Sequence, residues 1–296
     1  MFTGCGTALI TPFKQDGSLD EPALRSLVDR QIAAGINFLC PCGTTGESPT
    51  LSHAEHLRVV ELTVEQSRGR VPVLAGAGGY DTTHVIKLIA DLHKIGVSGI
   101  LSVTPYYNKP TQEGLYQHYK ALANSTPLRL IVYSVQSRTA VNVEPATLVR
   151  LAEIENIVGV KEASGSVSQM ASVLARVPES FIVLSGDDAV ALPLIALGGQ
   201  GVISVVSNEI PGEFTALTQA AMKGDFARAR QLQKKYQALM EINFVETSPG
   251  PVKFAMARMG LCEPVWRLPM VSPAPASQQK VEAVLESLGL LAGVRA

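Results

Sequence analysis

The stretch IVGVKEAS, residues 157–164, is an apolar run with several β-branched residues, and it ends in polar ones. Its hydrophobic residues are nearly continuous rather than alternating, which is typical of a parallel strand covered on both faces. A segment with helical periodicity, residues 168–175, follows after a short turn. A strand followed by a helix is the unit from which parallel sheets are built.

The same unit recurs along most of the chain. The apolar runs begin roughly 20 to 35 residues apart, and turns and amphipathic segments separate them. They lie at residues 6–13, 36–43, 71–78, 99–107, 129–135, 157–164, 181–188 and 201–208. Eight such units predict an α/β fold of the (β/α)8 class, the TIM barrel, and a doubly wound open sheet is the alternative.

Capping residues mark several of the expected helices. Ser52 and Glu55 form the capping-box pattern, and Asp20 and Asp81 are expected to cap two further helices. After residue 208 the β pattern ends, and the remaining apolar residues recur with helical spacing. We therefore expect a barrel over residues 1–224 and a C-terminal helical extension over residues 225–296.

Composition and charge restrict the possible partners. The chain has 296 residues, of which 46% are hydrophobic, and a formal net charge of −1. Both signs of charge are interspersed, so there is no basic stripe for nucleic acid and no polybasic anchor for a membrane. No apolar stretch is long enough to span a bilayer, and the N-terminus lacks a signal-peptide pattern. These features predict a cytoplasmic protein that acts on small molecules.

The cysteines, histidines and glycines give no sign of a metal or nucleotide site. The four cysteines are expected to be reduced, mostly buried thiols. His53 and His56 share a predicted helix face but have no third ligand, so we predict no metal site. Gly76 to Gly79 matches neither nucleotide-binding fingerprint, and we expect it to allow close backbone packing.

Lys161 is a charged residue inside the apolar run at 157–164. A lysine at the end of a buried strand either pairs with a carboxylate, such as that of Glu162 or Asp187, or loses its proton. In the second case it becomes a nucleophilic amine that can form a Schiff base with a keto group. This run alone leaves both alternatives open.

Polar residues with complementary chemistry follow the other predicted strands. In a (β/α)8 barrel the C-terminal ends of the strands meet at one mouth, where the chemistry takes place. A tyrosine can move protons, a Gly-Thr turn can bind a carboxylate, and an arginine can bind a second one bidentately. The residues expected at this mouth are Thr44, Thr45, Tyr106, Tyr107, Tyr133, Arg138 and Lys161. Together they favour amine–carbonyl chemistry.

These motifs resemble the 4-hydroxy-tetrahydrodipicolinate synthase family, long called dihydrodipicolinate synthase, of the superfamily of N-acetylneuraminate lyases and class I pyruvate aldolases. The resemblance extends over nearly the whole chain, including Arg267-Leu268-Pro269 near its end. It rests on residues 43–47, 106–108, 133–139, 159–163, 185–187 and 201–204.

The resemblance implies a metal-independent lyase without a cofactor that condenses pyruvate with L-aspartate 4-semialdehyde, on the route to diaminopimelate and lysine. Lys161 would form the Schiff base with pyruvate. The family also implies a homodimer or homotetramer, in which Tyr107 reaches into the site of a neighbouring subunit. The implied proton relay is Tyr133, Thr45 and Tyr107, and the implied substrate-binding residues are Thr44, Thr45, Arg138, Gly186 and Ile203.

The loop at 134–140 departs from the family pattern. Ser134, Gln136, Ser137 and Ala140 replace the usual Asn, Pro, Gly and Gly. Serine at 137 gives up the easy access to positive φ that glycine has, so we expect Arg138 to be presented differently. Arg138 itself matches the synthases, whereas the similar N-acetylneuraminate lyases lack an arginine there.

A second departure concerns regulation. Many family members are inhibited by lysine, which binds near the positions that are Ser48, His53, His56, Tyr80, His84 and Tyr106 here. Tyr80 and His84 replace the Asn and Glu of lysine-sensitive enzymes. Because a histidine in place of an acid removes a partner for the ammonium of lysine, we predict weak or absent feedback.

Two other functions fit the sequence. One is a related pyruvate-dependent aldolase that uses the altered loop for another aldehyde or a sugar acid. The other is a non-catalytic barrel that binds keto acids.

Overall fold

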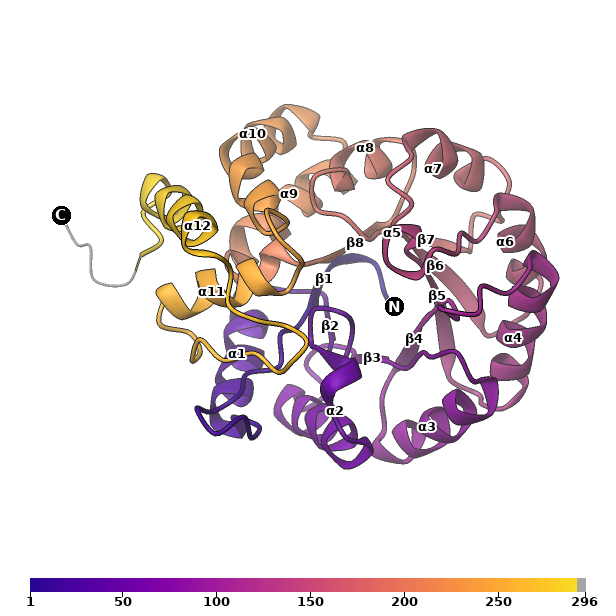
Figure 1. The fold of residues 1–296 in the computed structure, drawn as a ribbon. Helices are drawn as coiled ribbons and strands as arrows, with labels where there is room; N and C mark the ends of the chain where they lie inside the picture. Colours follow the sequence, from indigo (N-terminus) through magenta and orange to yellow (C-terminus); the bar gives the residue numbers. More distant parts are fainter. Residues whose placement is uncertain (292–296) are drawn as a thin grey trace.

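Eight parallel strands form a barrel, and helices surround it (Figure 1). The computed structural model describes residues 1–291. The strands are β1 Gly4–Ala8, β2 Phe38–Cys40, β3 Leu74–Gly76, β4 Gly99–Val103, β5 Arg129–Ser134, β6 Ile157–Glu162, β7 Ile182–Ser185 and β8 Gly201–Ser204. The predicted (β/α)8 fold is confirmed, and the open-sheet alternative is wrong.

The strands pair in the order β2-β1-β8-β7-β6-β5-β4-β3. β2 and β3, at the two ends of this order, meet through a parallel bridge between Leu39 and Val73, which closes the ring. Each predicted apolar run overlaps one strand. The first strand ends at Ala8 rather than near Phe13, and Pro12 in between has no amide hydrogen to offer a ladder.

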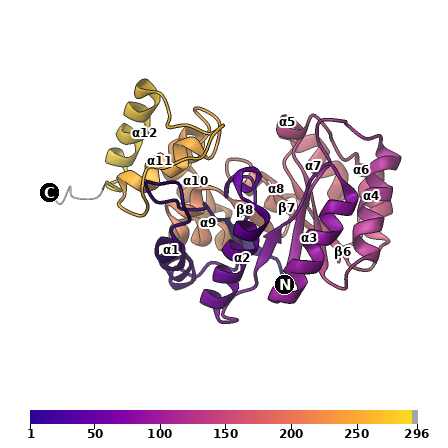
Figure 2. The ribbon, with the colours of Figure 1, turned by 60° about the horizontal axis from the view of Figure 1, so that its bottom comes forward.

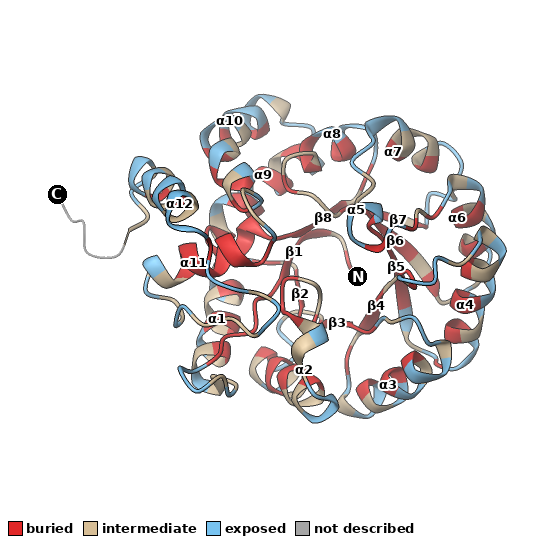
Figure 3. Ribbon diagram, in the orientation of Figure 1, coloured by how far each residue is buried: buried red, intermediate tan, exposed pale blue. Residues whose placement is uncertain are grey.

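The helices that follow the strands expose their outer faces and bury their inner ones (Figure 3). Three of these segments are short turns that follow β2, β5 and β8. The elements are α1 Glu21–Ala33, η1 Ser48–Thr50, α2 His53–Ser67, α3 Thr82–Ile95, α4 Gln112–Asn124, α5 Gln136–Thr139, α6 Pro145–Ala152, α7 Val167–Leu174, α8 Ala191–Ala196, η2 Val206–Asn208 and α9 Pro211–Met222.

The predicted caps are confirmed. Ser52 Oγ accepts a hydrogen bond from Glu55 N at 3.2 Å, while Glu55 Oε2 accepts one from Ser52 N at 2.9 Å. Asp20 and Asp81 cap α1 and α3. Helix α8 was not predicted, because its six residues, Ala191–Ala196, are all apolar and show no helical period.

Side chains fill the end of the barrel at which the strands begin. The N-terminus lies inside the ring of strands in Figure 1 and at the opposite end from α5 in Figure 2. Phe2 is fully buried there, and its ring centroid lies 5.7 Å from that of Phe38. Gly6 makes room for this packing, since a Cβ at residue 6 would lie 2.1 Å from Phe38 Cε2. The opposite end of the barrel is left for a site.

The cysteines and the glycines after β3 have the surroundings that the sequence predicted. All four cysteines are free thiols, and Cys5, Cys40 and Cys42 are buried. The glycines after β3 allow close packing, because a Cβ at Gly76 would lie 2.1 Å from the carbonyl oxygen of Cys42.

Three further helices, α10 Phe226–Ile242, α11 Gly250–Arg258 and α12 Pro275–Ser287, lie on one side of the barrel beside α1 and α9 (Figures 1 and 2). Val202 of β8, Leu239 of α10 and Val281 of α12 belong to one hydrophobic cluster. The boundary at residues 224 and 225 stays a prediction, and residues 292–296 of the predicted extension lie outside the described residues. Within residues 1–291, no helix is both long and apolar enough to cross a membrane.

Candidate active site

Lys161 lies on β6, in register with Tyr133 of β5 and Leu184 of β7. Its side chain is buried, with 5% of the residue exposed. The Nζ atom lies 4.2 Å from the centroid of the Tyr133 ring. The parallel pairing of two neighbouring strands therefore brings a primary amine and a phenol together at the same level of the barrel.

Neither of the two acids considered as a partner pairs with Lys161. Glu162, the next residue on β6, accepts hydrogen bonds from Gln169 Nε2 at 2.8 Å and from Ser164 N. Asp187 accepts from Ala189 N at 2.9 Å. Among residues 1–291, Lys161 takes part in no salt bridge, so the paired-lysine alternative is wrong for these acids. The amine of Lys161 is therefore buried in the barrel without a salt bridge to a described acid.

A cavity of about 580 Å³ opens above Lys161 at the C-terminal ends of the strands. Thr44, Thr45, Tyr133, Arg138 and Gly186 line it together with the lysine, so the structure brings these sequence-predicted residues together. Ile203 is fully buried on β8 and belongs to the barrel core, and Val205 lines the cavity near it instead.

Gly186 packs closely against the chain that carries Lys161. A Cβ at this position would lie 2.5 Å from Ala163 Cβ and 3.2 Å from Lys161 Cε. The amide of Gly186 also donates to the carbonyl oxygen of Glu162 at 2.7 Å, which fixes the loop after β7 against β6. A residue with a side chain would therefore have to displace Ala163 and would crowd Lys161.

Arg138 lies on the short helix α5, and its Nη2 donates to the carbonyl oxygen of Ser248 at 3.1 Å. Ser137 lies within α5 and does not need positive φ, so the serine causes no backbone strain there, and a different presentation of Arg138 stays a prediction. Ala140 takes the positive φ instead, at 57°, and ends this helix. The loop thus presents Arg138 to the cavity although it lacks the family's glycines.

The Gly-Thr-Thr-Gly turn after β2 is anchored from both sides. Thr11 Oγ1 donates to the carbonyl oxygen of Gly46 at 2.7 Å. Glu47 is buried at φ 52°, and its Oε1 lies 2.6 Å from Lys253 Nζ, with both side chains fully buried. The sequence analysis missed Lys253, although a lysine on the apolar face of α11 is the same kind of indication that pointed to Lys161.

The C-terminal part supplies a wall that the sequence analysis also missed. Phe244, Glu246, Thr247 and Ser248, between α10 and α11, line the cavity. Tyr107, in contrast, does not line this cavity; 89% of the residue is exposed, and its φ is 70°.

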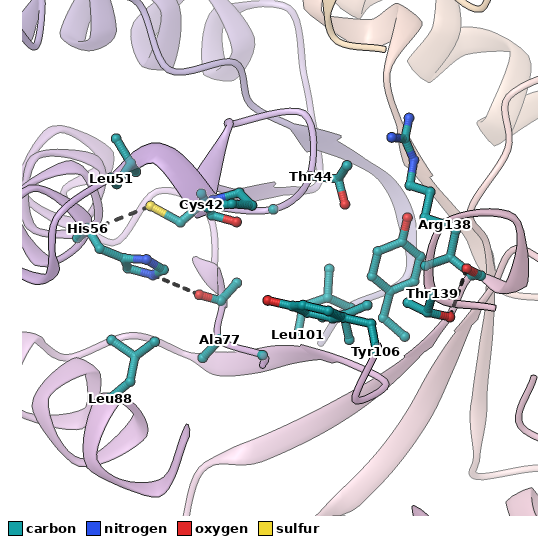
Figure 4. A pocket seen from close by; sticks show the side chains of 18 of the residues that line it. Cys42, Thr44, Leu51, His56, Ala77, Leu88, Leu101, Tyr106, Arg138 and Thr139 are labelled. Atoms are coloured by element: carbon teal, nitrogen blue, oxygen red, sulfur yellow. Dashed lines mark hydrogen bonds between the residues drawn. The ribbon is translucent and has the colours of Figure 1, made fainter. Parts of the chain in front are cut away.

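A second cavity of about 470 Å³ adjoins the first and shares Thr44, Tyr133, Val135 and Arg138 with it. Figure 4 shows His56 and Leu88 at one end of this cavity and Arg138 at the other. The residues predicted from the lysine-sensitive relatives gather here, since Ser48, His53, His56, His84 and Tyr106 all line it. Tyr80 does not, but its ring packs edge-on against Tyr106 at 5.5 Å.

The buried groups around the cavities are held neutral. Burial raises the pKa of the Cys40 thiol to about 11, although the nearby charge of Lys161 lowers it. Burial likewise lowers the pKa of His56, whose Nε2 donates to the carbonyl oxygen of Gly76 at 2.9 Å. At neutral pH the Cys40 thiol therefore stays protonated, and His56 presents an uncharged imidazole to the second cavity. The amine of Lys161 lines the first cavity.

A sequence model of the Dihydrodipicolinate synthetase family matches residues 1–288. A 4-hydroxy-tetrahydrodipicolinate synthase of Koribacter versatilis (strain Ellin345) is 53% identical over 289 residues, 97% of this chain and 96% of that protein. Dihydrodipicolinate synthase from Aquifex aeolicus superposes with a TM-score of 0.97 at 43% identity, covering 99% of this chain and 100% of that one. The chloride-inhibited enzyme from Acinetobacter baumannii, solved with pyruvate, gives a TM-score of 0.97 at 40% identity, covering 98% of this chain and 100% of that one. The chain therefore belongs to the dihydrodipicolinate synthetase family.

Proposed function

We propose that this protein is a 4-hydroxy-tetrahydrodipicolinate synthase, a lyase that condenses pyruvate with L-aspartate 4-semialdehyde on the route to diaminopimelate and lysine. The observation that carries the proposal is the buried amine of Lys161, which lies over the Tyr133 ring in a cavity and pairs with no carboxylate of the described chain. The reaction needs no cofactor, because the Schiff base itself acts as the electron sink. It takes place in the cytoplasm, where pyruvate is available.

In the proposed reaction Lys161 Nζ attacks the keto carbon of pyruvate, and the carbinolamine loses water to give an imine. Loss of a methyl proton converts the imine to an enamine, whose carbon attacks the aldehyde of the second substrate. The amino group of the semialdehyde part then attacks the imine carbon, which closes the ring and releases Lys161. The Tyr133 hydroxyl moves protons during these steps, and Thr45 and Tyr107 complete the relay. Tyr133 is the member of this relay that stands next to the amine.

The carboxylates of the two substrates are bound separately. Thr44 and Thr45, on the turn after β2, bind the pyruvate carboxylate with hydroxyl and backbone donors. Arg138, across the cavity on α5, binds the carboxylate of the semialdehyde. The backbone of Gly186 shapes the cavity, and Val205 lines it in place of Ile203.

Tyr107 acts in a neighbouring subunit of a homodimer or homotetramer. A tyrosine that is 89% exposed and held at positive φ projects away from its own barrel, which supports this assignment. A Tyr107→Phe variant should therefore lose turnover without losing stability.

Borohydride reduction in the presence of pyruvate tests the central step. The expected result is a stable pyruvate-derived adduct on Lys161, detected by the mass of the intact protein and located by peptide mapping. Lys253 is an internal control, because it is more deeply buried but paired with Glu47, and it should stay unmodified. A protein that turns over pyruvate and L-aspartate 4-semialdehyde without an adduct on Lys161 would contradict the proposal. Faster turnover of a sugar aldehyde would point to the related aldolase instead, and an adduct without turnover to a keto-acid-binding barrel.

A further inference from the structure

Glu209 and Asn243 form a buried pair next in the chain to a segment that lines the Lys161 cavity. Glu209 follows η2 at the end of β8, Asn243 ends α10, and at most 1% of either residue is exposed. Asn243 Nδ2 donates to Glu209 Oε2 at 2.6 Å. Glu209 Oε1 and Asn243 Oδ1, the other oxygens of the two groups, have no hydrogen-bond partner in the described part of the chain.

Within residues 1–291, no cation is hydrogen-bonded to this carboxyl group. Arg30 of α1 is close by, but its Nη1 and Nη2 donate to the main-chain carbonyls of Asn208 and Glu209, at 2.8 and 2.6 Å. The other charged neighbour is Asp188, a second buried acid, whose Oδ2 accepts from the amides of Val205 and Val206. Burial, and then the charge of Asp188, raise the pKa of Glu209 well above its ordinary value. The hydrogen bond from Asn243 and the charge of Arg30 act in the opposite direction but do not outweigh burial, so an ionised Glu209 would be a poorly compensated buried charge.

We propose that Glu209 is a neutral carboxylic acid that makes a two-point, cyclic hydrogen-bonded pair with Asn243. The acid hydrogen on Oε1 donates to Asn243 Oδ1, while Asn243 Nδ2 donates to Oε2. This arrangement satisfies both orphaned oxygens at once and leaves no net charge in the interior.

The pair positions one wall of the active-site cavity. Asn243 directly precedes the segment 244–248, whose residues Phe244, Glu246, Thr247 and Ser248 line the cavity. Ser248 also accepts the hydrogen bond from Arg138 Nη2. Glu209 is therefore a positioning residue that fixes this segment to the end of β8. Its expected effect on substrate binding, and that effect alone, rests on the proposed function.

Infrared spectroscopy tests the protonation state without reference to activity. The difference spectrum of wild type minus Glu209→Gln should contain the C=O band of a protonated carboxylic acid at a pH of about 7.5. Asp188 and Glu162, the other acids with raised pKa, are present in both proteins and cancel. Glu213→Gln, which changes an exposed glutamate near Arg30, should give only carboxylate bands. Absence of the acid band in the Glu209→Gln difference would overturn the proposal.

Two variants distinguish the hydrogen-bonded pair of Glu209 and Asn243 from a side chain that only fills space. The side-chain amide introduced by Glu209→Gln can make the same two-point pair, so the melting temperature and kcat/KM of this variant should stay close to those of wild type. Glu209→Ala leaves Asn243 without a partner, and we expect a melting temperature roughly 5 °C lower. Its KM for the semialdehyde should rise about tenfold, with kcat nearly unchanged.

The outcomes distinguish this inference from the proposed function. If Glu209→Gln is damaged as much as Glu209→Ala, the carboxyl group is needed in its ionised form and the cyclic pair is wrong. If the acid band is present but borohydride leaves Lys161 unmodified, the pair stands and the proposed function fails.

Discussion

Lys161 and Lys253 are both buried in this barrel, and their surroundings separate their roles. Lys253 Nζ lies 2.6 Å from Glu47 Oε1, so its charge is compensated and its role is structural. Lys161 lies over an aromatic ring, makes no salt bridge within residues 1–291, and lines a cavity large enough for a small substrate. Burial alone therefore does not separate the two lysines. The carboxylate of Glu47 occupies the amine of Lys253, whereas the amine of Lys161 is left available to a substrate.

Gly186→Ala should damage the active site without unfolding the protein. The added Cβ must displace Ala163, two residues after Lys161, and it also crowds Lys161 Cε. A displacement of about 1 Å at the reacting amine can cost roughly 100-fold in kcat/KM. Gly212→Ala on α9 is the matched control, since its Cβ would meet only Ala34 atoms at 3.9 Å. Steady-state kinetics and borohydride trapping of both variants provide the check, and equal activity of the two would contradict the role of Gly186.

At the scale of elements, the ends of neighbouring strands are tied together by buried acids. Asp188, after β7, accepts hydrogen bonds from the amides of Val205 and Val206 at 3.0 and 2.8 Å, where β8 gives way to η2. Burial nevertheless raises its pKa to about 6 from an ordinary 3.8, because these bonds do not fully replace water. Asp188 Oδ1 has no partner in residues 1–291.

This raised pKa predicts a pH dependence of stability. Because the folded-state pKa exceeds the unfolded one, Asp188 contributes stability that is complete below pH 3.8 and is lost as the pH rises through about 6. The loss amounts to roughly 3 kcal/mol in the free energy of unfolding. Urea denaturation at pH values from 4 to 7 should show this slope in wild type and a smaller slope in Asp188→Asn. An identical slope in both proteins would assign the pH dependence to other groups.

The second cavity also belongs to this scale, because α2, α3 and the loop after β4 line it. His84 and the Tyr80–Tyr106 pair offer no carboxylate to the ammonium of a bound lysine. We therefore expect weak or absent inhibition when lysine is titrated into the activity assay. A His84→Glu variant should become more sensitive, and half-inhibition of wild type at sub-millimolar lysine would refute the prediction.

At the scale of the whole molecule, the C-terminal part is joined to the mouth of the barrel. Glu47, on the turn after β2, binds Lys253 of α11 through Oε1 and the backbone amide of Arg267 through Oε2, the latter at 3.2 Å. Arg267 in turn donates to both oxygens of Glu55 on α2. Residues more than 200 positions apart thus hold the turn that carries Thr44 and Thr45.

Glu47→Gln should therefore be strongly destabilising, because it leaves the Lys253 ammonium buried without a counterion. We expect a loss of about 3–5 kcal/mol in the free energy of unfolding, measured with urea. The control Glu113→Gln removes an exposed pair with Arg150, at 2.9 Å, and should cost less than about 1 kcal/mol. The double variant Glu47→Gln/Lys253→Met should recover part of the loss. Equal effects of Glu47→Gln and Glu113→Gln would show that the buried pair is not an anchor.

Much of the fold and of the site could be predicted from local patterns. The eight apolar runs predicted the strands, since a strand covered on both faces must be apolar throughout. Lys161 was found as a charge in such a run. Lys253 was not, because a lysine in a helical segment usually lies on the exposed face, and the wall at 244–248 carries no motif that marks it as part of a cavity.

The sequence by itself determined the barrel class, the caps of its helices and the identity of the groups at the strand ends, because these depend on periodicity and on neighbours along the chain. Only the tertiary structure decided that Lys161 has no carboxylate partner among residues 1–291 and that Ala140 rather than Ser137 takes positive φ. It also decided that Glu47 pairs with Lys253 and Glu209 with Asn243. The physical reason is that charge compensation and desolvation depend on which side chains meet across the folded core, and no local pattern in the chain encodes that meeting.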